Sequence, residues 1–337
     1  MLRIFWVLLF SILISACSDK PEIVKLSGQA QGTTWNVSFW NTANVEPEKI
    51  QQELIAELAR IDLLLSNYRD DSHISKVNQN ATLEAIEIDP ELAYLIESAR
   101  QVNIASQGCY DLTIKPLFTL WGFSGNTFNL PSSAQISEAM YAVGMDKIQL
   151  HENHLQKKMA TTHIDVSSIG QGYSVAKLAA ILEKNKIDNY LAEIGGELQT
   201  RGQKPDQQPW RVAIERPLPN AQGFQKVVTM NTTDPVAIMT SGTYRHYFDQ
   251  DGQRYSHILD ARTGKPVTHT TVSVTVIHPD PTIADAWSTA LLCLGSEAGL
   301  NIANEQELAV LFIDQTELSM NESSSDAFKT LKGISVE

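Results

Sequence analysis

The chain has 337 residues, a net charge of −13, 43% hydrophobic residues and 19% charged residues. This composition is typical of a globular protein, because a disordered chain has fewer apolar residues and more charge. The acidic balance, without any run of lysine and arginine, argues against a nucleic-acid groove, which needs positive charge to neutralise phosphates. With only three cysteines and no CxxC or HxxxH pair, a disulfide scaffold and a typical zinc site are also excluded.

The first 16 residues have the features of a secretory signal peptide. The apolar run after Arg3 is too short to cross a bilayer, which needs about 20 residues. Small residues precede Cys17, and this arrangement resembles the lipobox of bacterial lipoproteins. On that resemblance Cys17 becomes the lipidated N-terminus, residues 17–24 form a tether, and residues 25–337 fold outside the cytoplasm. The alternative is a plain secretory signal followed by an unrelated cysteine.

The two remaining cysteines, Cys109 and Cys293, lie in mixed or apolar stretches far apart in the chain. They could pair, but their spacing is not that of a disulfide-rich domain. We therefore expect both to be reduced, buried thiols that behave as small apolar residues.

Helices are predicted where apolar residues recur at steps of three and four. Residues 47–67, 90–106, 173–186 and 284–294 show this spacing, with proline at the start of the first two and Gly295 after the last. Proline suits the first turn of a helix because its missing N–H has no partner there in any case.

Strands are predicted at residues 210–214, 271–277 and 308–313, from alternating or continuous apolar patterns. Strands therefore cluster after residue 188, whereas most of the long helices precede it, and no Pro/Ser-rich linker separates the two parts. The sequence predicts an α+β fold with mixed or antiparallel sheets and packed helices, as a single compact domain of two interleaved lobes.

The segment from Asp165 to Tyr173 is rich in serine and glycine and precedes a predicted helix. We expect a strand-like entry, a turn at Ser167–Gly172, and then the helix. Free backbone N–H groups at such a turn suit a phosphate. The simpler alternative is a turn that only caps the helix.

Asp285 and Thr289 are four residues apart in the last predicted helix, so their side chains share one face. A carboxylate combined with other oxygen donors is how proteins usually hold Mg²⁺. The alternative is a structural pair, with the aspartate near the helix start and the threonine bonded to a carbonyl.

Two further segments combine polar side chains with turn residues. His257 precedes an apolar pair and Asp260, and it is either a base or a structural histidine. The segment from Met239 to Arg245 predicts a turn followed by an arginine, which either holds a second anionic group or closes a hairpin.

Together and in this order, these segments resemble the ApbE family, the periplasmic FAD:protein FMN transferases. The resemblance extends over nearly the whole chain after the signal peptide. It is carried by residues 32–35, 65–69, 71–72, 108–113, 116–117, 120–123, 165–173, 195–197, 209–215, 240–245, 257–260, 263–264, 274–277 and 284–286.

The resemblance implies a cleft for FAD in an α+β fold, with residues on two sides of the nucleotide. The isoalloxazine and ribityl end would meet Gln31, Tyr68, Cys109, Tyr110 and Asp111. Cys109 stands where the family commonly has alanine or another small residue.

The resemblance further implies that the adenine and diphosphate end would meet Asp165, Gln171 and the chain near Leu259. Mg²⁺, the implied cofactor, would be bound by Asp285, Thr289 and the backbone oxygen of Ser168, and His257 would be the base.

The reaction implied is the transfer of FMN from FAD to a threonine or serine hydroxyl of an acceptor protein, with release of AMP. A neutral His257 would accept the hydroxyl proton, and with the ordinary pKa of about 6.5 its protonation would slow transfer as the pH falls. Two alternatives are Mg²⁺-dependent hydrolysis of FAD to FMN and AMP, and a lipoprotein that binds flavin without turnover.

The resemblance also implies partners and a location. The acceptors would be flavoproteins with a target threonine, such as subunits of membrane redox pumps, which favours the periplasmic face of the inner membrane. Ser18 is not the aspartate associated with inner-membrane retention, which leaves the outer membrane open.

Overall fold

A computed structural model describes residues 22–40, 45–125, 127–218, 223–316 and 319–337. The expected signal peptide and Cys17 lie outside these residues, and so does most of the expected tether. Val24, the last residue of that tether, is already the first residue of a strand. No helix within the described ranges is long and apolar enough to cross a membrane.

The helices are α1 (Pro47–Leu65), α2 (His73–Gln79), α3 (Pro90–Ala105), α4 (Lys115–Trp121), α5 (Ser133–Met140), α6 (Ser167–Lys184), α7 (Pro281–Glu305) and α8 (Asp326–Lys329), with short 3₁₀ turns at Met145–Lys147 and Pro205–Gln207. The strands are β1 (Val24–Ala30), β2 (Thr33–Trp40), β3 (Ile86–Glu87), β4 (Ile148–His151), β5 (His154–Lys157), β6 (Asn189–Ile194), β7 (Glu197–Arg201), β8 (Trp210–Glu215), β9 (Phe224–Met230), β10 (Val236–Gly242), β11 (Tyr247–Gln250), β12 (Gln253–Ser256), β13 (Leu259–Asp260), β14 (Lys265–Pro266), β15 (Thr271–His278), β16 (Ala309–Gln315), β17 (Met320–Ser324) and β18 (Ile334–Val336).

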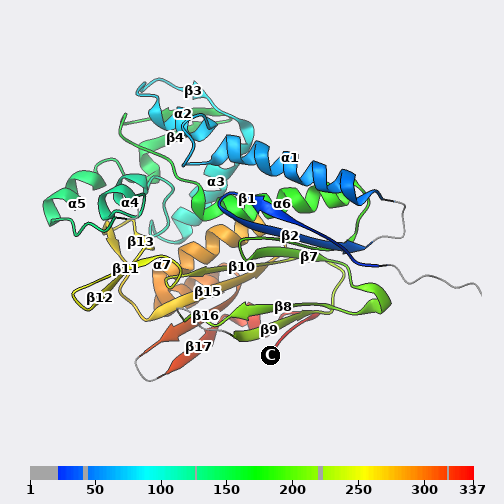
Figure 1. Cartoon of the computed structure of the whole chain (residues 1–337). Coiled ribbons are helices and arrows are strands. Elements are labelled where there is room, and N and C mark those ends of the chain that lie inside the picture. The colour runs from blue at the N-terminus through cyan, green and yellow to red at the C-terminus, as the bar shows by residue number, and fades with distance from the viewer. Residues whose placement is uncertain (1–21, 41–44, 126, 219–222, 317–318) are drawn as a thin grey trace, which may run out of the picture.

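The largest sheet has eight strands in the order β1-β2-β6-β7-β10-β15-β16-β17, and every neighbouring pair is antiparallel. In Figure 1, α1, α6 and α7 lie on one side of this sheet, and β8 and β9 lie on the other. Side chains alternate between the two faces of a strand, so each central strand contributes to two cores. Ile238 of β10 packs in the core beneath β8 and β9, whereas its neighbour Met239 packs under the helices. The α+β class is confirmed.

A smaller apolar cluster joins α4 and α5 to β13 and to the β11–β12 hairpin. Leu117, Trp121, Ile136 and Leu259 form its buried part. The indole Nε1 of Trp121 donates to the Gly264 carbonyl at 2.9 Å, which fixes α4 to the turn between β13 and β14. This cluster supports one wall of the cavity described below.

The periodic segments are confirmed. The predicted helices at residues 47–67 and 90–106 are α1 and α3, and the three predicted strands are β8, β15 and β16. The expectation that strands cluster after residue 188 is wrong in part, because β1 and β2 form a hairpin at one edge of the large sheet. Its tight turn is made by Gln31 and Gly32, both with positive φ (52° and 74°).

Two helices have different boundaries from those predicted. The sequence predicts a turn at Ser167–Gly172, whereas α6 already begins at Ser167 and includes both glycines. The helix tolerates Gly172 because α7 packs against it there. The prediction that Gly295 ends the last helix is correct for the first segment only: Gly295 breaks α7 with φ 74°, and the helix then resumes to Glu305.

The prediction of two reduced thiols is wrong. Cys109 and Cys293 form a disulfide with their Cα atoms 6.0 Å apart. The spacing along the chain carries no information on this pairing, because it is the packing of α7 on the loop after α3 that brings the two residues together.

Gly172 allows the closest approach between α6 and α7. A Cβ at this position would lie 2.6 Å from the Asp285 Cβ and would also meet the Pro281 carbonyl. We therefore expect Gly172→Ala to separate the two helices and to lower the free energy of unfolding by about 1–3 kcal/mol, measured by chemical denaturation.

Gly170→Ala is the matched control in the same helix, since a Cβ there meets nothing within 4 Å. Alanine is the better helix former, so this variant should be unchanged or up to about 1 kcal/mol more stable. Equal destabilisation by both substitutions would contradict the packing argument.

Candidate active site

A cavity of about 270 Å³ lies where the starts of α6 and β7, the end of β10, one face of α7 and the segment around β13 meet. Its walls contain every residue predicted from the sequence to bind FAD or metal or to act as base, except Gln31. These residues are Tyr68, Cys109, Tyr110, Asp111, Asp165, Ser168, Gln171, His257, Leu259, Asp285 and Thr289. Segments that are far apart in the chain therefore form one site.

Asp165 organises the start of α6. Its Oδ1 accepts the backbone N–H of Ser167 at 2.9 Å and the side-chain amide of Asn67 at 3.0 Å, and its Oδ2 lies 3.3 Å from Nζ of Lys115. The carboxylate thus accepts a hydrogen bond from one of the first backbone N–H groups of the helix, as a capping side chain does. The expected turn at Ser167–Gly172 therefore does not cap the helix, because those residues are already helical and the capping bond comes from Asp165. Asp165 and Lys115 both lie on the cavity wall.

Asp285 connects α7 to α6. Its Oδ2 accepts the backbone N–H of Gly172 at 2.7 Å. In a regular α-helix this amide bonds the carbonyl four residues earlier, which is that of Ser168. The Asp285 carboxylate therefore competes with the Ser168 carbonyl for the Gly172 amide, and both oxygens lie next to that amide.

Asp285 and Glu197 form a buried acidic pair in the cavity wall. Their side chains are 6% and 4% exposed, and Glu197 accepts the backbone N–H of Thr240 at 3.0 Å. Burial raises the pKa of Asp285 to about 7. Burial, together with the nearby Asp285 charge, also raises the pKa of Glu197 well above its usual value. Neither carboxylate has a lysine or arginine within ion-pair distance among the described residues.

Hydroxyl groups surround the acidic pair. The Oγ atom of Ser241 lies 3.1 Å from the Thr289 Oγ1 and 2.7 Å from the Ser288 Oγ. Two buried carboxylates without a cationic partner, next to a hydroxyl and a backbone carbonyl, form an all-oxygen donor set. Such a set fits a hard divalent cation, which would remove the cost of burying the negative charge.

His257 follows β12 and is partly exposed to solvent, although its ring nitrogen Nδ1 faces the protein. Its Nδ1 lies 2.8 Å from the His246 carbonyl oxygen, and its ring stacks on the His246 ring with centroids 5.6 Å apart. A carbonyl only accepts, so Nδ1 carries the proton and Nε2 is the free acceptor. Burial lowers the pKa of His257 to about 4. The expectation of an ordinary histidine pKa is wrong, because the imidazolium would lose its hydration in this site.

The loop after α3 provides the opposite wall of the cavity. Tyr110 is buried, and its hydroxyl accepts from the Ser168 hydroxyl at 3.1 Å. Asp111 is also buried, but its carboxylate accepts the backbone N–H groups of Thr113 and Met145 at 2.7 and 2.8 Å. Asp111 therefore stabilises the loop, and the polar group that this loop presents to α6 is the Tyr110 hydroxyl.

Gln31 lies apart from this group. It lines a neighbouring hollow of about 770 Å³, which shares Tyr68, Ser167 and Gln171 with the cavity. The Nε2 of Gln31 donates to the Ser174 hydroxyl at 2.8 Å. Tyr68 is 83% exposed at the border between the two spaces, and Nζ of Lys115 lies 5.6 Å from the centroid of its ring. The hollow and the cavity therefore adjoin each other and together offer binding subsites for the different parts of one large ligand.

Two charged residues of the cavity wall, Glu197 and Lys115, have no role assigned from the sequence, and a third, Arg245, is the arginine expected either to hold an anionic group or to close a hairpin. The guanidinium of Arg245 donates to the Gly195 carbonyl at 3.1 Å and lies 3.7 Å from Glu215. A signal for Glu197 was present in the sequence, because it is the one acidic residue of its strand and comes directly after two glycines. Nothing in the pattern distinguishes Lys115 from a surface lysine.

The comparisons with known proteins agree on one family. The ApbE family model matches residues 31–312. A protein of Vibrio cholerae serotype O1 named FAD:protein FMN transferase is 34% identical over 97% of this chain and 98% of its own length. The protein of the same name from Escherichia coli K12 is 33% identical over 93% of this chain and 90% of its own length.

Solved structures give the same result. The flavin transferase ApbE from Vibrio cholerae has a TM-score of 0.84 and 33% identity, covering 92% of this chain and 99% of that one. The apo flavinyl transferase ApbE of Pseudomonas stutzeri has a TM-score of 0.85 and 34% identity, covering 93% of this chain and 98% of that one. By its sequence and its fold, the chain belongs to the ApbE family.

Proposed function

We propose that this chain transfers FMN from FAD to a threonine or serine hydroxyl of an acceptor protein and releases AMP. The observation that carries the proposal is the state of His257, a partly buried neutral imidazole whose Nε2 is free to accept a proton in the cavity that holds the acidic pair. Membership of the ApbE family, and similarity to relatives named FAD:protein FMN transferase, support the same activity.

The reaction is a substitution at phosphorus. The bond between the acceptor's hydroxyl oxygen and the FMN phosphorus forms, and the bond from that phosphorus to the bridging oxygen breaks, so that AMP leaves with the bridging oxygen. Nε2 of His257 accepts the hydroxyl proton. In such reactions positioning and charge neutralisation do most of the work.

The cavity offers several groups that attract a diphosphate. Lys115 and Arg245 supply positive charge from two sides, and the start of α6 supplies the positive end of the helix dipole. These donors are fixed by the fold before the substrate arrives, which reduces the reorganisation needed in the transition state.

The proposed cofactor is Mg²⁺. Asp285, Thr289 and the Ser168 carbonyl would bind it, and Glu197 lies beside them. When bound, the ion would neutralise charge on the phosphate oxygens.

Hydrolysis of FAD to FMN and AMP is the nearest alternative, since water can replace the acceptor hydroxyl in the same site. Incubation of the detergent-solubilised protein with FAD, Mg²⁺ and a threonine-containing acceptor distinguishes the two. Transfer predicts an acceptor heavier by FMN less one water, with one AMP released per acceptor. AMP and free FMN with an unchanged acceptor would establish hydrolysis instead.

The lipobox-like start supports a periplasmic protein anchored by lipid at Cys17. We assign it to the inner membrane, where subunits of membrane redox pumps would be its acceptors, and keep the outer membrane as the alternative because Ser18 follows the cysteine. Both assignments rest on the N-terminal sequence and on the family resemblance alone.

His257→Asn tests the base. Asparagine keeps a polar side chain but has no basic nitrogen, so transfer should slow by about 10²–10⁴ while FAD affinity is retained. Single-turnover transfer and FAD fluorescence measure the two effects. His151→Asn, at an exposed position on β4, is the control and should behave as the wild type. Loss of FAD affinity in the His257 variant would make this residue a binding group.

The pH dependence follows from the lowered pKa of His257. Because the imidazole loses its proton near pH 4, it is a competent base at all higher pH values. With saturating Mg²⁺ the rate of transfer should therefore stay level from pH 7 to about pH 5 and fall only below it. A decline centred near pH 6.5 under these conditions would show that burial does not control this group.

Asp285→Asn tests the metal site. The neutral amide should raise the Mg²⁺ concentration for half-maximal binding and activity strongly. In the wild type, protons compete with the ion, so this concentration should rise as the pH falls below about 7, by up to about tenfold per unit. Calorimetric titration of the protein with Mg²⁺ gives a readout without turnover. Asp280→Asn is the control on the same helix, since asparagine also caps; equal effects would contradict the assignment.

Cys17→Ser tests the anchor. Without the thiol no thioether to lipid can form, so the variant should remain unprocessed or be recovered in the soluble fraction. Membrane fractionation and intact mass measure the outcome. Normal processing with retained membrane attachment would disprove the lipobox interpretation.

A further inference from the structure

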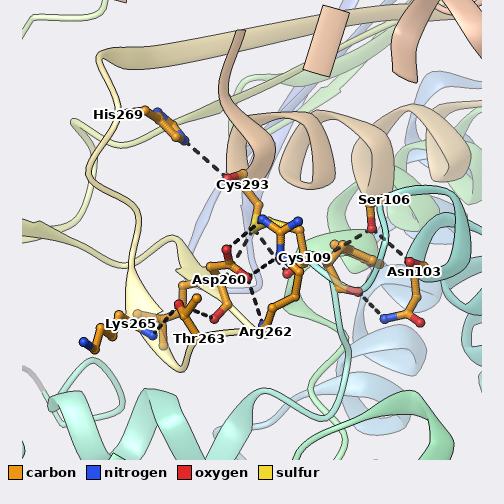
Figure 2. The surroundings of a disulfide bond; sticks show 11 residues. Asn103, Ser106, Cys109, Asp260, Arg262, Thr263, Lys265, His269 and Cys293 are labelled. Carbon is orange, nitrogen blue, oxygen red and sulfur yellow. Dashed lines mark hydrogen bonds and ion pairs between the residues drawn. A yellow bond between two sulfur atoms is a disulfide. The ribbon is translucent and has the colours of Figure 1, made fainter. Parts of the chain in front are cut away.

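The Cys109–Cys293 disulfide lies in the wall of the cavity proposed for FAD, and Figure 2 shows the residues around it. Both residues line the cavity, and their side chains are 1% and 4% exposed. The bond joins two segments 184 residues apart, the loop after α3 and the middle of α7. Nothing in the catalytic scheme above uses it, so its place in the wall needs an explanation.

On one side the bond holds the loop that carries Tyr110. This loop has little regular structure and is fixed by side-chain contacts: the Asn103 amide donates to the Tyr110 carbonyl at 2.6 Å, and the Tyr110 amide donates to the Ser106 hydroxyl at 3.3 Å. Cys109 directly precedes Tyr110. The disulfide therefore sets the position of the Tyr110 hydroxyl over the start of α6.

On the other side the bond holds the helix that carries the acidic face. Asp285, Thr289 and Cys293 are spaced by four residues, so they lie on one face of α7, and all three line the cavity. Gly295 breaks the helix only two residues later. The disulfide thus anchors the last turn of this helical segment, close to the point where it would otherwise be free to shift.

A third segment meets the same bond. The Cys109 carbonyl accepts the backbone N–H of Ala261 at 3.3 Å, and Nη2 of Arg262 lies 3.4 Å from the Cys109 sulfur (Figure 2). The carboxylate of Asp260 binds this arginine at 2.8 Å. Asp260 ends β13, which begins two residues after His257, and Ala261 and Arg262 lie in the turn that follows. The disulfide therefore lies where the walls with Tyr110, Asp285 and His257 converge.

A metal site is a weaker explanation for this cluster. The Cys109, Asp260 and Cys293 ligand atoms lie within 4.8 Å of one another, the one such group of at least three found in the described part of the chain. However, the disulfide uses both sulfurs and Asp260 is bonded to Arg262. The closed bond is therefore the feature that needs a function.

We propose that the Cys109–Cys293 disulfide is a positioning element of the FAD site. It holds the Tyr110 loop against the Asp285 and Thr289 face of α7, so that FAD and Mg²⁺ meet a wall already in place. A dithiol that transfers two electrons and two protons to the bond leaves two cysteine thiols and is itself oxidised to a disulfide. The reduced protein then has a looser cavity and a lower affinity for FAD. This inference rests on the proposed function, because it takes FAD as the occupant of the cavity.

The test compares Cys109→Ala, Cys293→Ala and the double variant with the wild type, at a temperature well below every melting point. Each substitution breaks the same bond, so all three variants should show the same rise in the KM for FAD, about tenfold. The Mg²⁺ concentration for half-maximal activity should rise with it. FAD binding followed by fluorescence, and amide hydrogen exchange, should show the same loosening without turnover, with faster exchange confined to residues 106–113 and 285–294.

Dithiothreitol is the matched treatment that removes no atoms from the wall. Reduced wild type should behave like the double variant, and the double variant should not respond to the reagent. Alkylation of the unfolded, unreduced protein should label neither Cys109 nor Cys293.

Several results would overturn the proposal. Labelling of both cysteines would show that the bond is absent. A lower melting point with unchanged KM, Mg²⁺ dependence and exchange would make the disulfide a stabilising link without a role in positioning. A shift in the Cys109 variants alone would assign the effect to contact of that side chain with FAD. A wild type that binds FAD but transfers no FMN would refute the proposed function, while FAD affinity and exchange would still decide on the disulfide.

Discussion

The hydrogen bond from the Gly172 amide to the Asp285 carboxylate is the contact on which the site depends. It requires α6 and α7 to approach so closely that no side chain fits at position 172. Because α6 begins in the cavity and α7 presents its polar face there, the same approach sets the distance between the amides at the start of α6 and the acidic pair. The large sheet beneath the two helices supports this arrangement.

Burial gives this site opposite effects on its acids and on its base. Asp285 and Glu197 hold their protons more tightly because a buried negative charge lacks hydration, whereas His257 holds its proton less tightly for the same reason. A metal-free cavity near neutral pH therefore favours neutral groups. When a divalent cation and a charged diphosphate bind together, charged groups become favourable in the cavity, because each of the two ligands lowers the cost of burying the charge of the other.

The sequence predicted the elements that have a local cause and missed those that depend on packing. The apolar spacing of α1 and α3 and the alternation in β15 are local, and both predictions are confirmed. The start of α6 was misplaced because two glycines normally argue against a helix, whereas here Gly172 is required by α7. The disulfide was missed for a related reason, since only the packing of α7 brings Cys293 to Cys109. Local patterns singled out Asp165, His257 and the Asp285/Thr289 pair but left their roles open, and the resemblance gave the roles and the remaining site residues. No pattern indicated Lys115.

The two pKa shifts also determine how the stability of the metal-free protein depends on pH. Asp285, with its pKa raised from 3.8 to about 7, binds a proton in the folded state that the unfolded state releases, so its contribution falls as the pH rises through this interval. His257, with its pKa lowered from 6.5 to about 4, has the opposite sign: the unfolded state binds the extra proton, and stability rises with pH over that range. The two slopes offset each other between about pH 4 and 6.5. A cation that keeps Asp285 ionised removes the pH dependence of stability that comes from Asp285 and leaves the one that comes from His257. The stability of the metal-bound protein, which is the form that would bind FAD, therefore depends on His257 being neutral.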